Sequence, residues 1–386
     1  NYGAVFIEDK FEIKDLILRL GLRVDRYDVN QPVLKDRYSL VDLRTVGETN
    51  MNAFNQGTFQ TPGNVAGDYV VYVDRNPDEY NGSNIGEFNV IGFRSGDEWF
   101  DAQGQSVLGA SNLGNAGVFP WFDVTSFTGI KGRIYDQYRI TEDAFEDYEP
   151  QVNVMPRVSF SFPISEEALF FAHYDVLTQR PSRNNVFTST YFYFQRAQGG
   201  RLNNPNLRPQ RNVDYQVGFQ QVLTRSSSLK LSTFYREMKD QISLIVIDGA
   251  YPVSSWETFG NIDFATSKGI TLEYDLRRTN RLAINANYQL AFADGTSYGE
   301  TANARLIQSG VSTNLRNPIP LNWDERHQFK VNIDYRFRDN DGPGVMSKPI
   351  KDEDGNIKVD ENGNPERTSG FKLFENFGVN LQLIAT

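Results

Sequence analysis

The chain has 386 residues and a formal net charge of −10, because 39 Lys and Arg face 49 Asp and Glu. It lacks cysteine and has two histidines, which excludes disulfides and thiolate sites and leaves little for a multi-histidine zinc site or a His-dependent proton relay. The acidic balance argues against nucleic acid as a partner, because phosphates require a basic surface. We expect a protein that is not an enzyme and holds neither a metal nor another cofactor.

Large aromatic rings are abundant, with 28 Phe and 19 Tyr, although the mean hydropathy is −0.50. No apolar run approaches the roughly 18 residues that a transmembrane helix requires. A chain of this kind crosses a membrane only as a closed β-barrel, because every backbone polar group must be paired in lipid. The N-terminal residues show no signal peptide, so we expect a mature or partial chain.

Strict alternation of apolar and polar residues is the main pattern, and it begins near the N-terminus. One parity is aliphatic from Leu16 to Val24, whereas the other carries Arg19 and Arg23. Such a period of two predicts strands that separate an apolar from an aqueous environment. The pattern recurs in three later segments, at residues 270–276, 282–290 and 329–338.

Ten strands are predicted, and several have about 9–11 residues or more, long enough to cross a bilayer when tilted. They are residues 2–13, 16–27, 156–162, 168–176, 213–223, 229–238, 268–277, 281–291, 326–338 and 371–382. The last of these runs to the end of the chain without a closing turn. We therefore expect the chain to be a piece of a wider barrel.

The connections between these strands are alternately short and long. The short turns fall at residues 14–15, 163–167, 224–228 and 278–280, and the long connections at 28–155, 177–212, 239–267 and 292–325. Short periplasmic turns, long extracellular loops and aromatic rings near strand ends are typical of outer-membrane barrels. The sequence thus predicts an all-β, antiparallel transmembrane β-barrel that spans the outer membrane many times. A soluble β-sandwich also alternates, and a soluble carbohydrate-binding module is the alternative.

An insertion at residues 339–370 stands on the side where a short periplasmic turn is expected. Asp354-Gly355 and Asn362-Gly363 favour tight turns on either side of residues 357–359. A calcium loop is the alternative, but the glycine and the final glutamate of an EF-hand are not at the required positions. We expect a solvated hairpin.

Several segments together resemble the barrel of a TonB-dependent outer-membrane receptor, especially the long SusC-related members from Bacteroidetes. The segments are residues 4–9, 16–27, 156–160, 180–182, 206–210, 215–219, 265–273 and 318–329, which include Asn206-Leu207-Arg208-Pro209 and Lys268-Gly269-Ile270. Their order matches across nearly the whole chain. The resemblance implies that residues 1–386 are a portion of a 22-stranded barrel, which a plug closes and the TonB complex energises. Neither a plug nor a TonB box is found in the sequence.

Two groups of residues are candidates for contact with a solute. The first lies in the long loops, where rings and carboxylates suit sugars or peptides, although the same rings suit packing of the loop 28–155 on itself or contact with a partner. Its members are Trp99, Trp121, Asp123, Trp256 and Trp323. The second group is expected to face the barrel lumen, where mutual ion pairing or contact with a plug is the alternative role. Its members are Arg19, Arg23, His173, Asp175, Glu273, Asp275, Arg336 and Arg338.

These features predict a receptor that captures a nutrient, such as a glycan, a peptide or a metal chelate, and imports it with energy from TonB. The expected partners are outer-membrane lipids, the TonB complex acting through a plug outside this chain, and a surface lipoprotein or other outer-membrane subunits. The alternative function is a receptor-like barrel that acts as a structural subunit in a larger assembly or secretion complex.

Overall fold

The structure is a computed structural model that describes residues 1–114, 117–122, 142–187, 201–297, 299–302, 317–337, 349–360, 363–366, 374 and 376–386. Asp123 and Arg338, both candidate contact residues, lie outside the described residues. Within the described ranges, no helix is long and apolar enough to cross a membrane.

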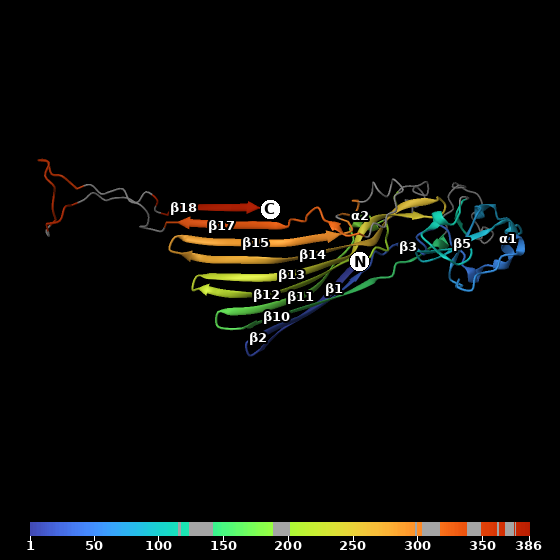
Figure 1. The fold of residues 1–386 in the computed structure, drawn as a ribbon, viewed down its shortest axis with the longest axis horizontal. Helices are drawn as coiled ribbons and strands as arrows, with labels where there is room; N and C mark the ends of the chain where they lie inside the picture. The colour runs from blue at the N-terminus through green and yellow to red at the C-terminus, as the bar shows by residue number, and fades with distance from the viewer. Residues whose placement is uncertain are drawn as a thin grey trace.

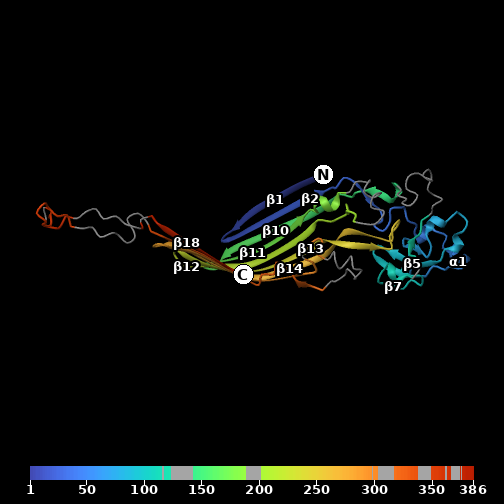
Figure 2. The same ribbon diagram turned by 90° about the horizontal axis from the view of Figure 1, so that it is seen from above.

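One antiparallel sheet of eleven strands dominates the molecule and curves along its length (Figures 1 and 2). Its strands are β1 (Tyr2–Ile13), β2 (Leu16–Tyr27), β10 (Gln151–Pro163), β11 (Ala168–Gln179), β12 (Gln210–Thr224), β13 (Ser227–Asp248), β14 (Ser255–Thr279), β15 (Leu282–Gly295), β16 (Ile319–Pro320), β17 (His327–Arg336) and β18 (Gly378–Ala385). Apart from the two-residue β16, which pairs with β15, neighbours in the sheet follow chain order, with β1 and β18 at the edges of the described sheet. Each predicted strand corresponds to one of them.

Tight turns join the strands at one end of the sheet, on the left in Figure 1. Lys14 (φ 55°) and Asn280 (φ 58°) take the left-handed conformation in two of these turns. Asparagine tolerates this conformation well, whereas most other residues avoid it. The short turns thus lie where the sequence predicts them, and this end is called the turn end.

Strands β13 and β14 are longer than the alternation predicts. The region 239–267 is not a loop, because the hairpin continues through a bulge near Asp240 until Asp248 pairs with Ser255. Beyond the bulge, residues 244–247 form a continuous apolar run. Such a run is typical of a strand buried on both faces, and it carries no alternation.

The described residues between β2 and β10, which are 28–114, 117–122 and 142–150, form a folded unit that we call the loop domain. It lies at the end of the main sheet opposite the turns (Figure 1). Its strands are β3 (Pro32–Leu34), β4 (Val70–Val73), β5 (Val90–Ser95), β6 (Glu98–Asp101), β7 (Ser106–Val107), β8 (Phe119–Pro120) and β9 (Phe145–Asp147). Strand β3 pairs with β9, and the others form a sheet in the order β7-β6-β5-β4-β8.

The helices in the part of the chain that the structure describes are all short. They are α1 (Phe54–Gly57), α2 (Arg183–Val186) and the 3-10 turns Val46–Glu48, Met51–Ala53, Pro77–Glu79, Ile85–Glu87, Ala110–Asn112 and Glu142–Ala144. All but α2 lie in the loop domain. The sequence pattern predicts none of them, since a helix of one turn carries no periodicity.

The loop domain is packed onto the extended β13–β14 hairpin. One hydrophobic cluster joins Tyr72 and Trp99 of the domain to Ile245, Ile247 and Trp256 of the hairpin. Burying such rings and aliphatic side chains contributes roughly 1.5–3 kcal/mol each. The domain is therefore fixed to the wall of the sheet by a shared core.

Residues 349–360 and 363–366 contain two tight turns and lie beyond the turn end, far from the loop domain (Figure 1). The Oδ1 atom of Asp352 accepts the backbone N–H groups of Asp354 and Asn356, at 3.1 and 2.8 Å. Asp360 repeats this arrangement with Asn364. These two carboxylates accept backbone N–H groups within tight turns, and the hairpin insertion at residues 339–370 stays a prediction.

The two faces of the main sheet differ in polarity. Cross-strand register places Tyr174, Tyr215 and Tyr235 side by side on one face, with ring centroids 5.1 and 6.1 Å apart. The same face carries Leu231, Leu272 and many other exposed apolar side chains in a continuous band. We call it the outward face, and the opposite one the inner face.

Candidate functional site

The predicted lumen residues lie together on the inner face. Directly paired residues on neighbouring strands point to the same side of a sheet. The register pairs Gly21 with Arg157, Arg157 with Asp175, and Asp175 with Asp214. By strand parity the register places seven predicted residues on this face: Arg19, Arg23, His173, Asp175, Glu273, Asp275 and Arg336. Their exposure to a lumen stays a prediction.

Ion pairs and hydrogen bonds between strands occupy much of the inner face. Arg236 contacts Asp214 at 2.6 Å, and Lys230 contacts Glu273 at 3.2 Å. Asp275 accepts a hydrogen bond from Asn285. Further along the face, Arg336 lies 3.8 Å from Asp334. Ion pairing, the alternative role for these residues, thus describes Glu273 and Arg336, whereas Asp275 is hydrogen-bonded to a neutral amide.

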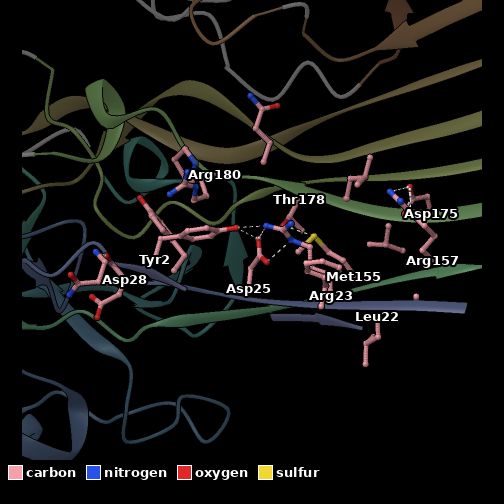
Figure 3. A pocket seen from close by; sticks show the side chains of 18 of the residues that line it. Tyr2, Leu22, Arg23, Asp25, Asp28, Met155, Arg157, Asp175, Thr178 and Arg180 are labelled. Carbon is pink, nitrogen blue, oxygen red and sulfur yellow. Dashed lines mark hydrogen bonds and ion pairs between the residues drawn. The ribbon is translucent and has the colours of Figure 1, made fainter. Parts of the chain in front are cut away.

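A cavity of about 1070 Å³ opens on the inner face near the loop domain (Figure 3). Strands β1, β2, β10 and β11 and helix α2 line it. We call it the arginine pocket. Its charged and hydrogen-bonding side chains include Tyr2, Arg23, Asp25, Arg157, Asp175, Arg180 and Arg183.

Asp25 is the centre of one polar cluster in this pocket (Figure 3). It accepts hydrogen bonds from the Tyr2 hydroxyl at 2.7 Å and from Arg23 Nε at 2.8 Å. Arg23 Nη2 also donates to the Tyr2 hydroxyl at 2.6 Å. The carboxylate is buried and the guanidinium is half exposed. Asp25 therefore fixes the direction in which Arg23 presents its charge.

Asp175 has the same role for Arg157. Both Nε and Nη2 of Arg157 donate to Asp175 Oδ2, at 3.1 and 2.8 Å, and His173 Nε2 lies 3.6 Å from the same oxygen. Above these pairs, the guanidinium of Arg180 lies 4.1 Å from the centroid of the Tyr2 ring. Stacking on an aromatic face holds a guanidinium without neutralising it.

A second cavity, of about 600 Å³, lies between the loop domain and strand β14. Its wall contains Arg94, which is 3% exposed. The Arg94 guanidinium donates to Tyr72 Oη at 3.0 Å and to the Gly96 carbonyl at 2.7 Å, and it forms an ion pair with Asp36. Burial would lower the pKa of Arg94, but Tyr72 and Asp36 overcome this effect and the pKa is raised. The buried guanidinium of Arg94 therefore holds together Tyr72, Gly96 and Asp36 within the loop domain.

Three of the predicted loop contacts are corrected by the structure. Trp99, Trp121 and Trp256 are 5%, 3% and 3% exposed, because they form the hydrophobic clusters of the loop domain and its seam with the hairpin. Their rings have no free face for a solute. Trp323 is 46% exposed and lines a small cavity of about 90 Å³ with Gln289. It stays a candidate contact.

Tyr2, Arg157 and Arg180 are site residues that the sequence analysis does not select for this role. Arg157 and Arg180 occur only within the segments that carry the family resemblance, and Tyr2 lies in the first predicted strand. Strand pairing brings together Tyr2 from β1 and Arg157 from β10, and Arg180 directly follows the end of β11. In the described part of the chain, no group of three or more metal-ligating side chains is found. Paired arginines, carboxylates and a phenol suit reversible binding of a solute.

The outer membrane protein β-barrel family matches residues 131–351, which is more than half of the chain. The chain therefore belongs to this family and is a protein of the outer membrane. The predicted all-β, antiparallel architecture and the outer-membrane location are confirmed, against the soluble alternative. Barrel closure, the number of strands and the SusC-related subtype stay predictions. No curated protein sequence matches the chain.

Solved structures to which the chain is similar include an iron transporter and a ferric-catecholate import receptor. The FrpB iron transporter from Neisseria meningitidis is 13% identical, with a TM-score of 0.38, and the match covers 98% of this chain and 36% of that one. The ferric-catecholate import receptor Fiu from Escherichia coli is 13% identical, with a TM-score of 0.39 and coverages of 96% and 37%. The chain thus spans about a third of the length of these proteins. The family assignment rests on the family match alone.

The packing of Tyr148 between the loop domain and the sheet should make the protein less stable at alkaline pH. Tyr148 is buried and packs edge-on against Tyr27, and burial raises the pKa of its hydroxyl from 10.0 to about 12. The raised pKa means that the stability contribution of Tyr148 is fully present below pH 10 and is lost as the pH rises to about 12. Replacing Tyr148 with Phe is expected to flatten the pH dependence of the urea midpoint in this window. An unchanged slope would contradict the assignment.

Proposed function

We propose that this chain is the ligand-binding wall of an outer-membrane receptor that captures a nutrient at the cell surface and imports it with TonB-derived energy. The observation that carries the proposal is the arginine pocket, a cavity of about 1070 Å³ on the inner face of a sheet from an outer-membrane barrel family. Cavities of this size, with a few convergent polar groups, are typical of solute sites. The role is binding and passage, without a chemical step on the solute.

The proposed orientation places the loop domain outside the cell and the tight turns in the periplasm, as in barrels with long outer loops. The loop domain would then stand above the membrane, and the arginine pocket would lie on the path from it into the lumen. The hairpin at residues 349–366 would project into the periplasm. A 22-stranded barrel and its plug, which the sequence resemblance implies, would complete the protein.

The partners in this proposal are membrane lipids on the outward face, the TonB complex acting through the plug, and a surface lipoprotein that delivers the nutrient. The nutrient class is a glycan, a peptide or a metal chelate. The SusC-related resemblance favours a lipoprotein partner. The loop domain offers it a rigid platform, since its core is continuous with β13 and β14.

Deletion of the gene in the native bacterium tests this proposal. Growth is expected to fail on one nutrient class when glycans, peptides and ferric chelates are supplied in turn as the limiting source. The full-length gene should restore growth, but not in a strain without TonB. Growth that stays normal on all three classes would contradict the proposal. Co-purification of the detergent-extracted protein with secretion or assembly subunits would then support the structural-subunit alternative.

A further inference from the structure

We infer that the arginine pocket binds an anionic group, a carboxylate or a phosphate, carried by the imported solute. The inference rests on the proposed function and adds the chemical class of the ligand. It follows from how charge is distributed between the buried and the exposed atoms of the pocket. The pocket has four arginines and four acids in its lining: Arg23, Arg157, Arg180, Arg183, Glu8, Asp25, Asp28 and Asp175.

The acids of the pocket are mostly shielded. The side chains of Asp25, Asp28 and Asp175 are 10%, 13% and 8% exposed, and each already contacts an arginine. Glu8 is the exposed acid of the lining, on the edge strand β1. Although the formal charges cancel, the solvent-facing atoms are mainly those of the arginines.

The arginines are exposed and held in place. The side chains of Arg23 and Arg157 are 46% and 48% exposed, and their carboxylate partners lie on the buried side, so N–H groups stay free toward the cavity. Arg180 stacks on Tyr2, and Arg183 lies 5.3 Å from the ring of Phe187. Within the described residues neither Arg180 nor Arg183 forms an ion pair with an acid at 4.0 Å or less, although the charge of Arg180 is close enough to act on Asp25.

This arrangement fits an oxyanion better than a neutral solute. Guanidinium groups bind carboxylates and phosphates through paired, charge-assisted hydrogen bonds. The buried aspartates fix Arg23 and Arg157 in advance, so that less side-chain entropy is lost on binding. Arg180 and Arg183 are the two groups that gain an ionic partner when the anion enters.

Calorimetric titration of the full-length, detergent-solubilised protein tests the inference, with citrate, inorganic phosphate and glucose as probes. At low salt, citrate or phosphate is expected to bind with a Kd of about 1 mM or tighter, and glucose much more weakly. The double variant Arg180→Gln, Arg183→Gln should weaken anion binding by about tenfold or more. Added NaCl should weaken binding to the wild type as well.

Arg211→Gln is the matched control. Arg211 is an exposed arginine on β12, and its strand parity places it on the outward face. Its loss should leave anion binding unchanged. The single variant Arg180→Gln keeps the test valid if the double variant does not fold, because Arg180 is exposed and its side chain stacks on the Tyr2 ring without a hydrogen bond or ion pair among the described residues.

The inference is overturned if glucose binds as well as the anions, if no anion binds, or if the double variant binds citrate like Arg211→Gln. If the double variant binds citrate like Arg211→Gln, Arg180 and Arg183 do not bind the anion and would instead contact the plug. None of these results touches the growth phenotype of the deletion strain, which tests the proposed function separately. If the deletion strain grows normally on all three nutrient classes but the protein still binds anions, the import role is contradicted and the anion site is retained.

Discussion

Replacing Arg94 with Met is expected to unfold the loop domain selectively. The change leaves Asp36, the Tyr72 hydroxyl and the Gly96 carbonyl without the guanidinium that pairs them. Removing one partner from a buried ionic cluster costs about 3–5 kcal/mol. A urea titration of the full-length protein, followed by tryptophan fluorescence, should show an early transition, because Trp99 and Trp121 lie in the cores of this domain.

The control for this experiment is Arg75→Met. Arg75 pairs with Glu87 at 3.2 Å, but the two side chains are 44% and 61% exposed. Exposed pairs of this kind contribute about 1 kcal/mol or less. If both variants show the same midpoint, Arg94 does not anchor the loop domain.

Replacing Leu272 with Arg is expected to destabilise the sheet in a bilayer by about 2–4 kcal/mol. Leu272 lies on the outward face of β14, paired with Leu231 and Tyr288 on its two neighbours. An arginine there would face lipid. The measurement is the folded fraction of the full-length protein in liposomes across a urea series, read from its heat-modifiable mobility on a gel.

Thr271→Arg provides the comparison from the adjacent position. Thr271 faces inward, between Ser232 and Gln289 on the neighbouring strands. A charge on this polar face should be tolerated with a much smaller loss. A larger loss for Thr271→Arg than for Leu272→Arg would reverse the assignment of the two faces.

The sequence predicts the strands well where they separate two environments. Residues 16–27 match β2 at both ends, because every second residue from Leu16 to Val24 is aliphatic, while the other parity carries Arg19, Arg23 and Asp25. The prediction fails for residues 239–267, where the hairpin leaves the region of alternation and enters the core of the loop domain. Alternation reports a difference between two sides of a strand, and it vanishes where both sides are buried.

The site is only partly predictable for a related reason. Arg23 and Asp175 are selected because they occupy the polar parity of a strong strand. The positions of their partners Tyr2 and Arg157 follow from the strand register. The register pairs β1 with β2, and it pairs β2 with β10, which follows the loop domain in the chain. The tryptophans show the converse error. A ring in a long connection suggests a surface contact, but a connection of this length folds and uses its largest rings for its own core.

The shared core of the loop domain and the β13–β14 hairpin has a consequence for biogenesis. The cluster joins residues 38–110 to residues 245–256, so it stays incomplete until the later segment has been synthesised and delivered to the membrane. Contacts so distant along the chain form slowly. Until then Tyr72 and Trp99 lack part of their packing. The partly folded chain therefore exposes hydrophobic surface that periplasmic chaperones can bind. Closure of this cluster is therefore a late step of assembly, coupled to insertion of the hairpin.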